Sequence, residues 1–161
     1  MNRIGIGYDL HRLVPDRPLI LGGVRIPFPL GLEGHSDADV LLHAIMDALL
    51  GAAARKDLGH HFPPGDERYR DISSLVLLEE VRRIIVAEGY RVINVDAVLI
   101  AQEPRLAPYI EAMVANIAAA LGISPGAVSV KATSTEGVGA CGRQEAMAAQ
   151  AVVLISHGEG D

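Results

Sequence analysis

Residues 34–43 read GHSDADVLLH, a segment that places ionisable side chains and a hydroxyl at the start of a predicted helix. Ser36 is the predicted N-cap, because its hydroxyl can accept a hydrogen bond from the backbone N–H of Asp39. Apolar residues then recur at helical spacing, which predicts a helix over residues 37–53 with one buried face. The free N–H groups at its start, beside His35, suit a bound phosphate; plain capping with a solvent-exposed histidine is the alternative.

The composition predicts one domain, residues 1–161, with a core of small aliphatic side chains. Half of the residues are hydrophobic, only 4% are aromatic, and a chain of this length buries about two thirds of its unfolded surface. Cys141 is the single cysteine, which excludes an internal disulfide and favours a reducing compartment. Neither a membrane-length apolar run nor a signal peptide is present, so we expect a cytoplasmic protein without a membrane partner.

The charge balance argues against a nucleic-acid partner. The formal net charge is −6, and lysine and arginine do not cluster anywhere along the chain. Binding to a phosphate backbone needs a basic face, so any phosphate that this protein binds must be met by local groups.

Turn signals and apolar periodicity predict strands that alternate with helices. The predicted strands cover residues 3–10, 91–101, 128–132 and 146–155, with a hairpin over 19–26 around a Gly-Gly pair. The predicted helices cover residues 37–53, 74–88 and 105–121, and residues 27–34 and 56–66 are expected to be loops. This order implies an α/β (α+β) fold, a mixed sheet with helices on one or both faces.

A possible metal site arises from three residues that are distant in the chain. Asp9 and His11 stand two apart at the end of the first strand, so both side chains leave it on one face. With His43 from the helix they supply one carboxylate and two imidazoles, the ligand set of a zinc site with an open position. The alternative is that Asp9 caps a turn and the histidines are ordinary polar residues.

A second polar segment, TSTE at residues 133–136, follows a predicted strand. Its three hydroxyls and one carboxylate suit phosphate oxygens and a hard cation such as Mg²⁺, although a hydrophilic loop is the alternative. Lys131 and Arg143 are further cationic candidates, with solvent-exposed surface charges as their alternative.

Several segments together resemble the family of 2-C-methyl-D-erythritol 2,4-cyclodiphosphate synthases. They are GIGYDLHR (5–12), LGGVRIP (21–27), HSDADVLLHA (35–44), ALLGAA (48–53), DLG (57–59), KATSTE (131–136) and GR (142–143). The likeness runs in order from residue 3 to about 155. The chain departs from the family pattern at Ser134, where threonine is usual, and also at Leu58, Ala140, Gln144 and Ala146.

The resemblance implies an α/β homotrimer with active sites between neighbouring subunits. It implies the conversion of 4-diphosphocytidyl-2-C-methyl-D-erythritol 2-phosphate into the 2,4-cyclic diphosphate and CMP, a lyase reaction of non-mevalonate isoprene biosynthesis. It assigns Zn²⁺, or another divalent cation, to Asp9, His11 and His43, and Mg²⁺ or Mn²⁺ at the diphosphate to Glu136. His35 and Ser134 correspond to the groups that stabilise the transition state.

The same resemblance implies contacts to the nucleotide-diphosphate substrate along most of the chain. The matching positions are Asp9, His11, His35, Ser36, Asp57, Gly59, Phe62, Asp66, Ala101, Arg105, Leu106, Ala107, Thr133, Ser134, Thr135, Glu136, Ala140 and Arg143.

Two other functions share part of this pattern. A metal-dependent phosphohydrolase would use metal-bound water as its nucleophile, and solvent oxygen would then enter the product. A trimeric regulator that binds a metal or an isoprenoid would need the three metal ligands, but it would leave the hydroxyl-rich segment at 133–136 without a role.

Overall fold

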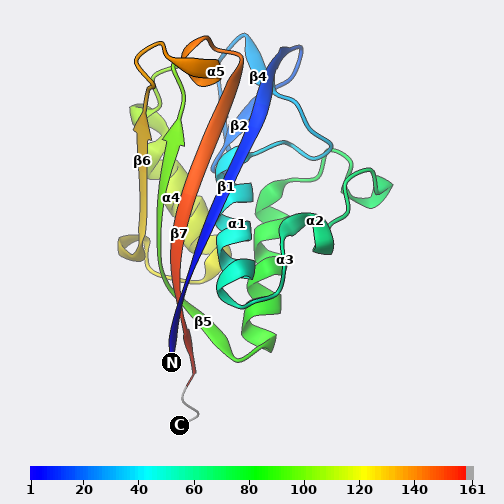
Figure 1. Cartoon of the computed structure of the whole chain (residues 1–161), viewed down its shortest axis with the longest axis vertical. Coiled ribbons are helices and arrows are strands. Elements are labelled where there is room, and N and C mark those ends of the chain that lie inside the picture. Colours follow the sequence, from blue (N-terminus) through cyan, green and yellow to red (C-terminus); the bar gives the residue numbers. More distant parts are fainter. Residues whose placement is uncertain (159–161) are drawn as a thin grey trace.

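A five-stranded mixed sheet in the order β4-β1-β7-β5-β6 forms the frame of the computed structural model, which describes residues 1–158 (Figure 1). Only the β5–β6 pair is parallel among the described strands; the other neighbours are antiparallel. A separate two-stranded hairpin pairs β2 with β3. The strands are β1 (Asn2–Pro15), β2 (Leu19–Leu21), β3 (Val24–Ile26), β4 (Leu30–Leu32), β5 (Tyr90–Ile100), β6 (Val128–Thr133) and β7 (Ala146–His157).

The long helices all cover one face of this sheet. They are α1 (Val40–Ala52), α3 (Ser74–Ala87) and α4 (Ile110–Leu121), with short helices α2 (Leu58–His61) and α5 (Gly139–Gly142) and 3₁₀ turns at Glu67–Tyr69, Ala107–Tyr109 and Pro125–Ala127. Figure 1 shows α1 behind β1 and β7, and the opposite face of the sheet open. On that open face Ile4, Ile6 and Tyr8 are 57–74% exposed. The mixed sheet is therefore confirmed, with helices on one face only.

Two glycines let α1 pack directly on the backbone of β1. A Cβ atom at Gly7 would lie 1.9 Å from the carbonyl oxygen of Ala44, and one at Gly5 would lie 1.9 Å from that of Ala48. Any side chain at these positions would push the helix away from the strand. Because Asp9 follows on the same face of β1, this close approach also brings the start of α1 to Asp9.

Gly7→Ala is expected to lower the free energy of unfolding by about 3 kcal/mol, since the clash is with backbone that cannot rotate away. Gly51→Ala is the matched control, because Gly51 lies at an exposed position of α1 with open space around it. This substitution should raise the free energy of unfolding by about 0.5–1 kcal/mol. Urea denaturation measures both. Equal stability of the Gly7→Ala variant and the native chain would contradict the packing described.

The cap of α1 differs from the prediction. The helix begins at Val40, and its N-cap is Asp39, whose side chain accepts a hydrogen bond from the backbone N–H of Leu42. The assignment of Ser36 as N-cap is wrong, because Ala38 turns the backbone into the left-handed region (φ +57°) and separates Ser36 from the helix. The Ser36 hydroxyl accepts from the N–H of Ala38 instead, at 3.2 Å.

Asp39 also fastens the predicted Gly22-Gly23 hairpin, which is confirmed, to the start of α1. Its carboxylate accepts from the N–H of Gly22 at 3.0 Å and from that of Gly23 at 2.8 Å, and the side chain is fully buried. Burial, together with the neighbouring charge of Asp37, raises the pKa of Asp39 to about 6 against the opposing effect of the N–H donors. The hairpin is thus held against the helix that carries His43.

Four further boundaries differ from the predictions. The strand expected over 3–10 continues to Pro15, so Asp9 and His11 lie within β1 and not at its end. The expected loop 27–34 contains β4, which pairs with the end of β1, and the expected loop 56–66 contains α2, capped by Asp57. Residues 105–121 form α4 only from Ile110 onward, because a 3₁₀ turn with proline near its start precedes it. Within residues 1–158, we find no helix with the length and apolarity needed to cross a membrane.

Candidate active site

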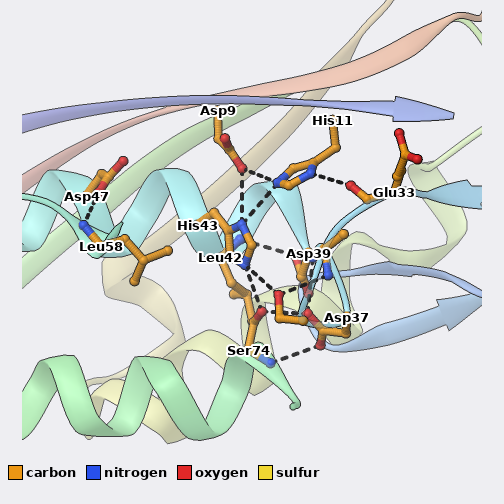
Figure 2. A network of polar contacts seen from close by, with 12 residues as sticks. Asp9, His11, Glu33, Asp37, Asp39, Leu42, His43, Asp47, Leu58 and Ser74 are labelled. Carbon is orange, nitrogen blue, oxygen red and sulfur yellow. Dashed lines mark hydrogen bonds and ion pairs between the residues drawn. The ribbon is translucent and has the colours of Figure 1, made fainter. Parts of the chain in front are cut away.

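The structure brings Asp9 and His11, from within β1, together with His43 from the first turn of α1 (Figure 2). Asp9 Oδ2 lies 2.8 Å from His11 Nε2 and 3.1 Å from His43 Nδ1, and these two nitrogens lie 3.2 Å apart. One ligand atom from each residue therefore faces a common point, with all three atoms within 4.8 Å of one another. The group has the donor set and spacing of a divalent-cation site.

The hydrogen bonds behind His11 leave its inward nitrogen free to bind a cation. Its Nδ1 lies 2.7 Å from the backbone carbonyl oxygen of Glu33, which can only accept, so Nδ1 carries the proton. In the neutral ring Nε2 then holds the lone pair that a cation would bind, and in the protonated ring Nε2–H donates to Asp9 Oδ2 at 2.8 Å. A backbone carbonyl in this place is a common support for a metal-binding histidine.

Burial and hydrogen bonding oppose one another at Asp9. Burial alone would raise the pKa of this carboxyl, but the hydrogen bonds from His11 and His43, and their charges, outweigh it and hold the pKa well below its ordinary value. For His11, burial alone would lower the pKa; the hydrogen bond and charge of Asp9 reverse this and raise the pKa above 6.5. The carboxylate is thus charged at neutral pH, and a proton on His11 competes with a cation.

Metal affinity is expected to fall as the pH is lowered, starting above pH 6.5 because the pKa of His11 is raised. Each proton that the metal must displace weakens the apparent affinity about tenfold per pH unit below that pKa. Titration of the metal-free protein with zinc and a competing chromophoric chelator between pH 8 and pH 5 measures this. An affinity that stays constant over this range would show that His11 is not a ligand.

A cavity of about 190 Å³ opens beside the three ligands, between α1, α2 and α3. His35 lies on its wall, and its Nε2 donates to the carbonyl oxygen of Asp66 at 2.7 Å, which ties the segment after α2 to the site. Asp57 caps α2 by accepting from the N–H of His60. The lining residues are His11, His35, Ser36, His43, Leu58, Gly59, Phe62, Pro63, Pro64, Tyr69 and Leu77.

A second hollow, of about 320 Å³, lies at the other edge of the sheet, where β5 and β6 end. It is lined by residues 101–107 together with Ala132, Thr133 and Ser134. The Ser134 hydroxyl accepts from the N–H of Glu136 at 3.2 Å. The side chain of Gln102, which the sequence analysis missed, accepts from the N–H of Gly137 at 3.0 Å and joins the two segments that form the hollow.

The two hollows are separate within one chain. Across the sheet, Asp9 is level with Ala149 of β7, Leu99 of β5 and Ala132 of β6. Three strand spacings amount to about 14 Å, which is too far for one cation or one phosphate to bridge. The structure therefore does not bring the residues 133–136 of a chain to that chain's own metal ligands.

The remaining candidates lie outside both hollows. Arg143 pairs with Glu145, and Lys131 pairs with Asp96 on the open face of the sheet. Ala140 and Cys141 belong to α5; Cys141 is buried, and burial raises the pKa of its thiol, which argues against a reactive nucleophile. Within residues 1–158, neither Arg143 nor Ala140 lines the two hollows described above.

Comparison with known proteins agrees with this fold over almost the whole chain. The model of the YgbB family matches residues 2–156. The 2-C-methyl-D-erythritol 2,4-cyclodiphosphate synthase of Moorella thermoacetica is 64% identical over 153 residues, 95% of this chain and 94% of that relative. The bifunctional IspDF of Campylobacter jejuni aligns with a TM-score of 0.94 at 38% identity, over 98% of this chain and 43% of that longer chain. A CDP-bound 2C-methyl-D-erythritol-2,4-cyclodiphosphate synthase aligns with a TM-score of 0.87 at 36% identity, over 96% of this chain and 100% of that chain.

A one-sided mixed sheet that presents an Asp–His–His group beside a cavity defines an α/β domain able to hold a divalent cation. The chain belongs to the YgbB family. The Moorella relative and the CDP-bound relative are named 2-C-methyl-D-erythritol 2,4-cyclodiphosphate synthases, so the resemblance drawn from the sequence is confirmed.

Proposed function

We propose that this chain is a 2-C-methyl-D-erythritol 2,4-cyclodiphosphate synthase that cyclises 4-diphosphocytidyl-2-C-methyl-D-erythritol 2-phosphate and releases CMP. The observation that carries the proposal is the convergence of Asp9, His11 and His43 beside a cavity that His35 and Ser36 line. Family membership supports the choice of reaction.

The ligand atoms of each group of residues indicate which cation that group would bind. Asp9, His11 and His43 offer one carboxylate and two imidazoles, which suit Zn²⁺ with a fourth position open; Glu136 and its neighbouring hydroxyls offer only oxygen, which suits Mg²⁺ or Mn²⁺. When bound, such cations neutralise phosphate oxygens and so favour the approach of one phosphate to another.

The residues of the chain supply position rather than a strong base. A phosphate monoester has a second pKa near 6, so the 2-phosphate is mostly dianionic at neutral pH and needs no proton removed before it attacks the β-phosphorus. His35 and Ser36 line the cavity where this phosphate would be held. The Ser36 hydroxyl accepts from the N–H of Ala38, which leaves its own hydrogen for a phosphate oxygen.

Ser134 is proposed to act at the diphosphate of the substrate, as negative charge shifts to the leaving CMP. Its oxygen accepts from the N–H of Glu136, and its hydrogen is directed at Oε1 of the same residue over a long 3.5 Å, a contact that a phosphoryl oxygen can replace. We assign the hollow of residues 101–107 with Thr133 and Ser134 to the cytidine diphosphate side of the substrate. Structures of relatives described as CDP complexes support the assignment of a nucleotide diphosphate.

We further propose that three copies of the chain assemble and that each complete site combines two of them. The separation of Asp9 from residues 133–136 within one chain supports this, because the reaction needs both at one substrate. The open face of the sheet carries Ile4, Ile6 and Leu10 at 74%, 65% and 45% exposure, a surface suited to association. The cytoplasmic location expected from the single cysteine stays a prediction.

A CMP-release assay, run with and without a chelator, tests the proposed reaction. We expect release of CMP that stops on chelation and resumes when zinc and magnesium return. In water labelled with ¹⁸O the cyclic product should carry no label, whereas a phosphohydrolase would incorporate it. Labelled product would favour the phosphohydrolase, and metal binding without CMP release would favour a regulator.

A further inference from the structure

Behind His43, on the side away from Asp9, lie two polar residues that have no role in the site described above, the buried Ser74 and the half-buried Asp37. Ser74 is the first residue of α3 and is fully buried, and its hydroxyl oxygen lies 3.1 Å from His43 Nε2 (Figure 2). The same hydroxyl lies 2.5 Å from Oδ1 of Asp37. The three side chains thus form a line from Asp37 through Ser74 to His43.

The direction of each hydrogen bond in this line is determined by the carboxylate. An ionised carboxylate only accepts, so the single hydroxyl hydrogen of Ser74 is donated to Asp37. The Ser74 oxygen then faces His43 Nε2 with a lone pair, and Nε2 must carry a proton. With its Nε2–H accepted by Ser74, His43 can give up the Nδ1 proton that Asp9 Oδ2 accepts at 3.1 Å in the cation-free chain, and the Nδ1 lone pair is then available to a cation.

Asp37 is itself held in place by two backbone donors. Its Oδ2 accepts from the N–H of Ser74 at 2.9 Å, and its Oδ1 accepts from the N–H of Asp39 at 3.1 Å. The carboxylate therefore joins the start of α3 to the segment that leads into α1, and it remains anchored when the Ser74 hydroxyl is removed. Ser36 also lies near His43 Nε2, at 3.3 Å, but its hydrogen is not committed to a carboxylate, so it cannot set the tautomer.

We infer that Ser74 and Asp37 are positioning residues: Ser74, oriented by Asp37, accepts the Nε2–H of His43, and the two so stabilise the form of the ring whose Nδ1 binds a cation. The inference rests on the proposed metal site and concerns the ring in its cation-binding form. Supporting groups of this kind around ligating histidines change metal affinity by about ten- to a hundredfold.

Ser74→Ala is the direct test, with Ser73→Ala as its matched control. Ser73 is adjacent in sequence and caps α3 by accepting from the N–H of Leu75, without a hydrogen bond to His43. We expect Ser74→Ala to weaken zinc binding about ten- to a hundredfold at pH 8, and Ser73→Ala to lower stability without changing zinc affinity. The measurement is a zinc titration against a chromophoric chelator. Native zinc affinity in Ser74→Ala would overturn the inference.

A double-substitution cycle separates positioning from general loss of structure. If Asp37 acts through Ser74, Asp37→Asn added to Ser74→Ala should weaken zinc binding no further than Ser74→Ala alone. In the zinc-loaded native chain, ¹⁵N NMR should show a His43 Nε2–H that exchanges slowly with solvent because Ser74 accepts it, and Ser74→Ala should show faster exchange. Equal exchange of this proton in the two chains, or fully additive losses of affinity, would contradict the inference. The proposed function fails separately, by the absence of CMP release from a chain whose His43 Nε2–H is protected.

Discussion

His43→Ala is expected to remove stoichiometric zinc and to reduce CMP release to background while the chain stays folded. The substitution leaves Asp9 and His11 as two ligands on one strand, which is one short of the three protein ligands of an open catalytic site. The core packing of α1 is kept, because His43 faces the site and not the sheet-facing apolar residues of the helix. Zinc content by atomic emission and the CMP-release assay measure the two effects.

His60→Ala is the control for this substitution. His60 lies in α2, is exposed, and is not part of the three-ligand group, so its loss should leave both zinc content and turnover unchanged. A fully active His43→Ala variant with one zinc per chain would refute the assignment of the ligands.

Ser134→Ala is expected to lower kcat about ten- to a thousandfold, by comparison with the loss of one donor to a developing oxyanion. The substitution removes the hydroxyl, whose hydrogen makes only a long 3.5 Å contact to Glu136 Oε1 and can turn to a phosphoryl oxygen of the substrate. The effect should appear in kcat more than in KM, since the donor is most effective as charge shifts in the transition state.

Ser134→Thr provides the control, because it keeps the hydroxyl and adds the methyl that is usual at this position in the family. Activity close to that of the native chain is expected for this variant. A kcat that is the same for alanine and serine at position 134 would exclude Ser134 from the reaction.

The element order was predictable because the local signals agree with the tertiary structure. Alternation of Gly5 and Gly7 with exposed apolar residues marks β1, and Gly22-Gly23 marks the hairpin. The cap of α1 was not predictable. Ser36 and Asp39 are both good capping residues, and the choice between them depends on N–H groups from a hairpin far away in sequence.

The candidate site could likewise be predicted from the sequence only in part. Asp9, His11 and His43 carry a recognisable ligand set, but only the close packing of α1 on two glycines shows that the strand and the helix meet. Ser74 carries no local signal, because a serine at a helix start is most often a cap. Its contacts to Asp37 and His43 cross more than 30 positions of sequence and appear only in the folded chain.

The separation of the two halves of the site was likewise invisible in the order of the motifs. It follows from the strand order, which places β7 and β5 between Asp9 and the loop after β6. One chain thus places its metal ligands and residues 133–136 at different edges of its sheet. We propose that a working site joins the metal ligands of one copy to residues 133–136 of another.

Mixing two inactive variants tests this claim most directly. His43→Ala lacks the metal half-site, and the double variant Ser134→Ala/Glu136→Ala lacks the loop half-site; each should be inactive alone. If the two are unfolded together, refolded in equal amounts and assayed for CMP release, random assembly makes about one half times one half of the sites complete, or about a quarter of native activity. Activity that stays at the level of the separate variants would contradict a site shared between subunits.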